Sequence, residues 1–117
     1  IYVAPTGYHL KLSHNGLLSV VDLPPVNGLK PCADILFESA ANLYGKNVLG
    51  VILSGMGSDG TLGSQKIKEH GGKIITQDRE TSVIFSMPQS VINQGYVDVV
   101  KPIHEIAQEI QKQVELL

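Results

Sequence analysis

Cysteine, net charge and long apolar runs are scarce in this sequence of 117 residues. Cys32 is the only cysteine, which excludes a disulfide framework and a cysteine-based zinc cluster and suits a reducing cytoplasm. Nine Lys and Arg against eleven Asp and Glu leave a formal net charge of −2, and the basic residues are scattered, so nothing favours nucleic acid or an anionic membrane as a partner. No apolar stretch approaches the roughly 18 to 20 residues of a membrane span, so no membrane insertion is expected.

The residues that are present predict one globular domain built from alternating strands and helices. With 43% hydrophobic and 17% charged residues, the chain can bury a core of its own. The pattern predicts the following elements: strand-like residues at 1–4, a β-hairpin over 8–23 with its turn at His14-Asn15-Gly16, a helix over 33–44, a buried strand over 48–54, a helix from 59 or 61 to 70, a strand over 73–77, a short strand at 83–85, a small helix over 88–94, a strand over 97–100 and a helix over 102–117.

The order of these elements indicates an α/β fold. Apolar residues fill nearly every position of the run 48–54, which is typical of a strand buried on both faces in a parallel sheet. We therefore expect a three-layer α/β/α sandwich, Rossmann-like, with a mostly parallel sheet and one β-hairpin.

The loop after the buried strand is the main candidate for a site, because ligands of such folds bind at the carboxyl ends of the strands. It reads SGMGSDG over 54–60 and permits three interpretations. The spacing Gly55-x-Gly57-x-x-Gly60, with Asp78 further on for a ribose hydroxyl, fits a dinucleotide-binding loop, although Asp59 would repel the pyrophosphate. Asp59 could instead cap the following helix. In the third interpretation, the glycines expose backbone amides and Asp59 orients a catalytic histidine. The local pattern leaves all three open.

Five segments, taken in order, resemble the signatures of a known family. They are IYVAP at 1–5, PPVN at 24–27, ADILF at 33–37, GVILSGMGSDG at 50–60 and FSMP at 85–88. Together they resemble the chemotaxis protein-glutamate methylesterase family of CheB type. The motif at 50–60 is the most specific of them.

The resemblance implies a cytoplasmic hydrolase that releases methanol from glutamate methyl esters of methyl-accepting chemotaxis receptors and also deamidates receptor glutamines. Both reactions use a serine nucleophile, a histidine base and an aspartate, and neither needs a cofactor or a metal. Asp59 matches the aspartate of this triad. Met56 matches a position whose backbone amide stabilises the oxyanion. Through the same resemblance, Gly57, Met87 and Pro88 are expected to border the substrate cleft, but a core methionine before a proline at a helix start explains Met87 and Pro88 equally well.

Two motifs of the family are not found in the sequence. The family's serine lies in a Ser-Thr-Gly-Gly type turn and its histidine in a His-Met-Pro type motif, both upstream of the counterpart of Ile1. We therefore expect residues 1–117 to form the C-terminal part of a catalytic domain, inactive alone, with those motifs and a regulatory receiver domain elsewhere in the full-length protein.

No other residue replaces the missing serine and histidine. The chain has no Gly-x-Ser-x-Gly elbow, and Cys32 has only Lys30 near it in sequence to lower its pKa, so we expect no thiol nucleophile. The four histidines lack metal-ligand spacing, and each is expected to be structural or solvated: His9, His14, His70 and His104. A non-catalytic interaction domain remains the alternative from another class.

Overall fold

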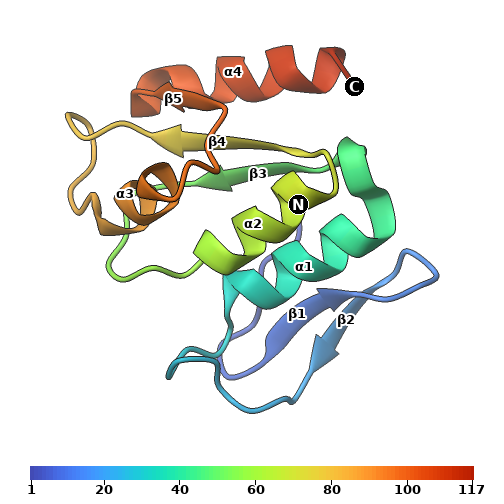
Figure 1. The fold of residues 1–117 in the computed structure, drawn as a ribbon. Coiled ribbons are helices and arrows are strands. Elements are labelled where there is room, and N and C mark those ends of the chain that lie inside the picture. The colour runs from blue at the N-terminus through green and yellow to red at the C-terminus, as the bar shows by residue number, and fades with distance from the viewer.

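The structure, a computed structural model, describes all residues from 1 to 117. Its elements along the chain are β1 (His9–Leu12), β2 (Leu18–Val21), α1 (Ala33–Tyr44), the 3-10 helix η1 (Gly45–Asn47), β3 (Leu49–Ile52), α2 (Thr61–Glu69), β4 (Lys73–Gln77), α3 (Ser86–Asn93), β5 (Val99–Lys101) and α4 (Ile103–Glu115). The strands β3, β4 and β5 form a parallel sheet in that order (Figure 1). The predicted α/β sandwich is confirmed.

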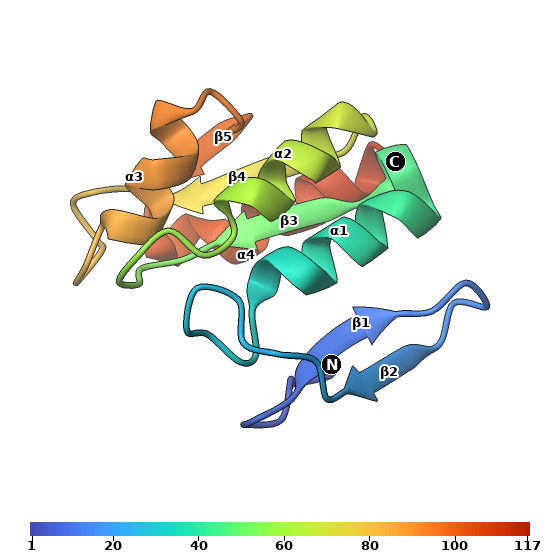
Figure 2. The ribbon, with the colours of Figure 1, turned by 60° about the horizontal axis from the view of Figure 1, so that its bottom comes forward.

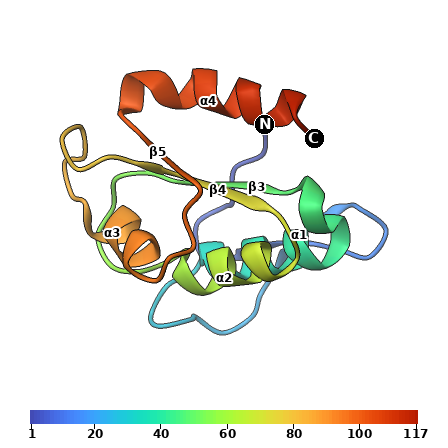
Figure 3. The same cartoon turned by 45° about the horizontal axis from the view of Figure 1, so that its top comes forward.

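Helices cover both faces of the parallel sheet. Helix α4 lies on one face, and α1, α2 and α3 lie on the other (Figure 3). The central strand β4 shows why both faces need cover: Ile74 and Ile75 are adjacent, point to opposite faces and are both fully buried. The core cluster consists of Ala41, Ile52, Ile67, Ile74 and Val91. None of the helices has the length and apolarity needed to cross a bilayer.

The antiparallel hairpin forms a separate layer beneath α1 (Figure 2). Its register pairs His9 with Val21 and Leu12 with Leu18, so the loop is longer than a two-residue turn. Gly16 in this loop has φ 80°, a conformation that glycine adopts without strain. The hairpin attaches to α1 through the Leu12 amide, which donates to Ser39 Oγ at 2.9 Å.

Two predicted strands are absent. Residues 1–4 are not part of any sheet, and Ile1 and Val3 are exposed. Residues 83–85 are not a strand either, because the Ile84 backbone bonds to the Ser54 hydroxyl and to the Gly55 amide instead of to a strand. Strand-like composition was misleading in both places, since a strand needs a partner to pair with. Helix α3 begins at Ser86, two residues before the predicted Pro88.

Candidate active site

The loop that connects β3 to α2 lies at the carboxyl edge of the sheet, as predicted. Asp59 in this loop is half-buried and lines a cavity of about 450 Å³. One wall of the cavity comes from the loop itself, through Met56, Gly57 and Ser58, and the other from the turn at 26–29 and the start of α1. The cavity is therefore built between segments that are far apart in sequence.

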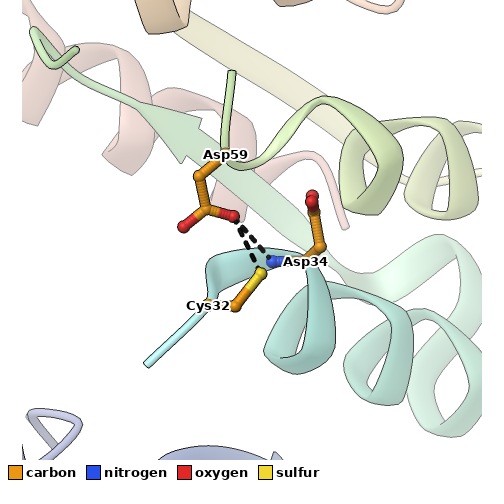
Figure 4. A group of neighbouring side chains, drawn as sticks. All are labelled: Cys32, Asp34 and Asp59. Atoms are coloured by element: carbon orange, nitrogen blue, oxygen red, sulfur yellow. Dashed lines mark hydrogen bonds between the residues drawn. The ribbon is translucent and has the colours of Figure 1, made fainter. Parts of the chain in front are cut away.

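The Asp59 carboxylate caps helix α1 from outside that helix. Cys32 occupies the N-cap position of α1 but makes no side-chain capping bond, so the first amides of the helix need another acceptor. Asp59 Oδ2 accepts from the Ala33 amide at 2.8 Å. Asp59 Oδ1 accepts from the Asp34 amide at 3.2 Å and from Cys32 Sγ at 3.2 Å, and Figure 4 shows these two bonds. A helix N-terminus is a favourable place for a carboxylate acceptor, because its first amides have no partner within the helix.

Asp34, in the first turn of α1, caps helix α2 in the same way. The N-cap of α2 is Gly60, which has φ 94° and no side chain to offer. Asp34 Oδ1 accepts from the Gly60 amide at 2.9 Å and from the Gly63 amide at 2.7 Å. Asp59 therefore does cap a helix, but the sequence-based interpretation that it caps the following helix is wrong, because Asp34 fills that role.

Burial and mutual repulsion set the electrostatics of this cluster. Burial raises the pKa of Asp34, the Gly60 and Gly63 amides oppose the rise, and the nearby Asp59 charge adds to it. Burial together with the Asp59 acceptor raises the pKa of the Cys32 thiol to about 11. The thiol is thus a protonated donor at neutral pH.

Cys32, Asp34 and Asp59 also have the side-chain types and the proximity of metal ligands. Ligand atoms of Cys32, Asp34 and Asp59 lie within 4.8 Å of one another. However, Asp59 holds two helix amides and the thiol, Asp34 holds two further amides, and a protonated thiol is a poor ligand. The cluster is therefore best described as a capping network.

The geometry does not favour the dinucleotide interpretation. The amides that would bind the pyrophosphate at the start of α2 are already bonded to Asp34. The Asp78 carboxylate, which would bind the ribose, accepts from the Thr81 amide at 3.0 Å and from Thr81 Oγ1 at 2.6 Å. That carboxylate closes its own turn, and these bonds lower the pKa of Asp78.

Met56 and Gly57 line the cavity with Asp59, whereas Met87 and Pro88 lie on the core side of the loop. The Met56 side chain is 78% exposed, and its backbone amide makes no hydrogen bond within the chain. Met87 packs against the core and against Gly55, where an added Cβ would lie 2.5 Å from the Met87 sulfur. Pro88 is fully buried. Met87 and Pro88 thus support the loop from behind rather than line either pocket beside Gly57.

None of the four histidines reaches the cavity. His9 is buried, accepts the Cys32 amide at Nδ1 and donates from Nε2 to the Pro24 carbonyl, so it anchors the segment before α1. His70 bonds to the Lys66 carbonyl at the end of α2. His14 lies in the hairpin loop and His104 on the exposed first turn of α4. Their expected structural or solvated roles are confirmed.

Sequence reasoning missed the roles of Asp34 and Cys32. Both belong to the stretch in which α1 begins, and an acidic residue in the first turn of a helix is an ordinary stabilising feature. The sequence offered no sign that Asp34 would bond to a different helix, since that contact depends on how α1 packs against α2.

Comparisons with known proteins agree on one family. The family described as CheB methylesterase matches residues 1–110. A protein-glutamate methylesterase/protein-glutamine glutaminase of Archaeoglobus fulgidus is 43% identical over 99% of this chain and 34% of its own length, and one of Clostridium acetobutylicum is 40% identical over 96% and 32%. The crystal structure of the Thermotoga maritima CheB methylesterase catalytic domain matches with a TM-score of 0.90 and 40% identity, covering 99% of this chain and 61% of that one. The chain thus spans about a third of the length of these curated relatives. With the family match across nearly its whole length, the chain belongs to the CheB methylesterase family.

Proposed function

We propose that residues 1–117 are the later part of the catalytic domain of a protein-glutamate methylesterase that also deamidates glutamine. Its substrates are methyl-accepting chemotaxis receptors, it works in the cytoplasm, and a receiver domain elsewhere in the full-length protein regulates it. Family membership supports this proposal. The structural observation that carries it is the Asp59 carboxylate, which is fixed by three donors at the edge of a cavity and lies in the same loop as the unbonded Met56 amide.

Asp59 retains the capacity to orient a histidine. Its Oδ2 accepts only the Ala33 amide, and a carboxylate oxygen can accept two hydrogen bonds. The remaining position of Oδ2 is available for the Nδ1–H of an imidazole supplied by the rest of the protein. Asp59 then holds the tautomer in which Nε2 is the base and stabilises the imidazolium that forms.

The chemistry follows from these assignments. A serine from the rest of the protein attacks the ester carbonyl, and the histidine takes the serine proton and gives it to the departing methoxide, so that methanol leaves. The Met56 amide donates to the oxyanion of the tetrahedral intermediate. Water then attacks the acyl-enzyme by the same route. With a glutamine substrate, the leaving group is ammonia.

The test compares Asp59→Asn with a matched aspartate variant in the full-length protein. Asp59→Asn is expected to lower methanol release from methylated receptor by about 10⁴-fold, as loss of the triad aspartate does elsewhere. Asp22→Asn is the control, because Asp22 is an exposed aspartate whose ion pair with Lys30 contributes little. Unchanged turnover in Asp59→Asn would show that this segment is a non-catalytic interaction domain.

A further inference from the structure

Two serines join the glycine loop to the segment that leads into α3. Ser54 Oγ donates to the Ile84 carbonyl at 3.0 Å and accepts from the Ile84 amide at 2.9 Å. Ser86 Oγ makes the converse pair, donating to the Gly57 carbonyl at 2.8 Å and accepting from the Gly57 amide at 3.2 Å. Each hydroxyl thus bridges both backbone groups of a single residue in the opposite segment.

The two bridges flank the proposed oxyanion donor. Met56 lies between Gly55 and Gly57, and its own amide makes no hydrogen bond within the chain. Gly55 is held on one side by its amide bond to the Ile84 carbonyl and by its carbonyl, which accepts from the Met87 amide at 3.0 Å. The Met56 N–H shares a peptide plane with this Gly55 carbonyl, so the bond from Met87 sets the direction of the Met56 amide. Gly57 is the point at which the chain is held on the other side of Met56.

Ser86 is what holds Gly57. Gly57 has φ 91°, and no atom from outside its immediate neighbours comes within 4 Å of where a Cβ would be, so side-chain packing does not fix its conformation. A glycine without such contacts has access to many backbone angles. The two bonds to Ser86 Oγ are the only hydrogen bonds that the Gly57 backbone makes.

We propose that Ser86 is a positioning residue for the esterase and deamidase reactions, whose hydroxyl fixes Gly57 and thereby keeps the part of the loop that carries the Met56 amide from shifting away from the oxyanion. This inference rests on the proposed function. Because Ser86 acts through the backbone of the loop, its loss affects the transition state, in which the oxyanion exists, more than the bound substrate. Removing one oxyanion donor outright costs about 10² to 10³ in kcat. Loosening a donor that is still present is expected to cost less.

The experiment uses the full-length protein with three serine variants. Ser86→Ala is expected to lower kcat for methanol release by about 5- to 30-fold and leave KM within about twofold, below the cost of losing a donor outright. Ser86→Thr keeps the hydroxyl and is expected to recover most of the activity. Ser82→Ala is the control, since the Ser82 hydroxyl also donates to a backbone carbonyl, that of Asp78, but does not touch the loop.

A wild-type measurement provides a second test that does not depend on a variant folding. The Gly57 amide is expected to exchange with solvent more slowly than the amides of Met56 and Ser58, neither of which is bonded within the chain. Equal exchange at the three positions would overturn the proposal, as would full kcat in Ser86→Ala or an equal loss in Ser82→Ala. If the Ser86 results are negative and Asp59→Asn also retains full activity, the proposed function is wrong. If they are negative but Asp59→Asn is inactive, only the proposed role of Ser86 is wrong.

Discussion

Asp34 and Asp59 cap each other's helices. Asp59, just before α2, accepts the first amides of α1, and Asp34, in the first turn of α1, accepts the first amides of α2. Figure 4 shows the Asp59 side chain directed at the start of α1 and the Asp34 side chain projecting beside it from the first turn of α1. The position of the proposed triad aspartate is thereby tied to the packing of the two helices.

The first prediction concerns the capping role of Asp34. Asp34→Ala removes the acceptor of two amides and is expected to lower the free energy of unfolding by about 1 to 3 kcal/mol. Asp34→Asn keeps an oxygen acceptor and is expected to cost less than half as much. Urea unfolding of the full-length protein measures both. Equal losses in the two variants would show that the charge, rather than the acceptor, matters.

The pH dependence of stability is a second consequence of Asp34. Burial, followed by the repulsion from Asp59, raises its pKa above the ordinary value of 3.8, so the folded state binds the proton more tightly than the unfolded state does. Its contribution to stability is therefore fully present below pH 3.8 and is lost as pH rises through the folded pKa. Relative to Asp34→Asn, the wild type is expected to lose stability across that window. A flat difference between the two, from urea unfolding at successive pH values, would contradict this assignment.

Local sequence was enough to predict most of the elements but not the contacts between them. The strand before the glycine loop, the helices and the hairpin were recognised because their patterns are local. The acceptors of the loop amides could not be recognised in this way, because Asp34 and Ser86 lie 26 and 29 residues away from the amides that they bind. Asp78 is a different case: its spacing fitted a ribose, but its carboxylate closes a local turn with Thr81, three residues further on. Tertiary packing decided the contacts of Asp34 and Ser86.

Cys32 is predicted to resist thiol reagents in the native protein. Its pKa of about 11 instead of 9.0 lowers the thiolate fraction near neutral pH by about 100-fold, and the residue is only 3% exposed. Labelling by a disulfide reagent is expected to be slow in buffer and fast in denaturant. Rapid native labelling would show that the bond to Asp59 does not persist in solution. Cys32→Ser, which keeps a donor toward Asp59, is expected to retain activity.

Two neighbouring residues of α2 are predicted to respond in opposite directions to replacement by alanine. A Cβ on Gly63 would lie 2.5 Å from Phe37 Cβ and 3.0 Å from the Asp34 backbone, so Gly63→Ala is expected to force the helices apart and cost about 1 to 3 kcal/mol. Ser64 is fully buried and its hydroxyl has no hydrogen-bond partner. Ser64→Ala is expected to stabilise the protein by about 1 kcal/mol. Thermal unfolding of the two variants checks both signs, and destabilisation by Ser64→Ala would reveal an unrecognised partner for the hydroxyl.

The last prediction is that residues 1–117 alone release no methanol from methylated receptor. They contain the proposed orienting acid, Asp59, and the proposed oxyanion donor, the Met56 amide, but nothing that replaces the nucleophile and the base. Ser58 and Ser90 line the cavity, and no histidine lies beside them there. An oxyanion hole and binding site can retain about 10³ to 10⁴ over water without a triad, but only with a complete substrate cleft. The assay compares this chain with the full-length protein and its Asp59→Asn variant at equal concentration. Turnover by the chain within about tenfold of the full-length protein, where triad loss costs at least about 10⁴, would mean that the nucleophile lies within these residues, and Ser54, Ser58 and the histidines would then be replaced one at a time.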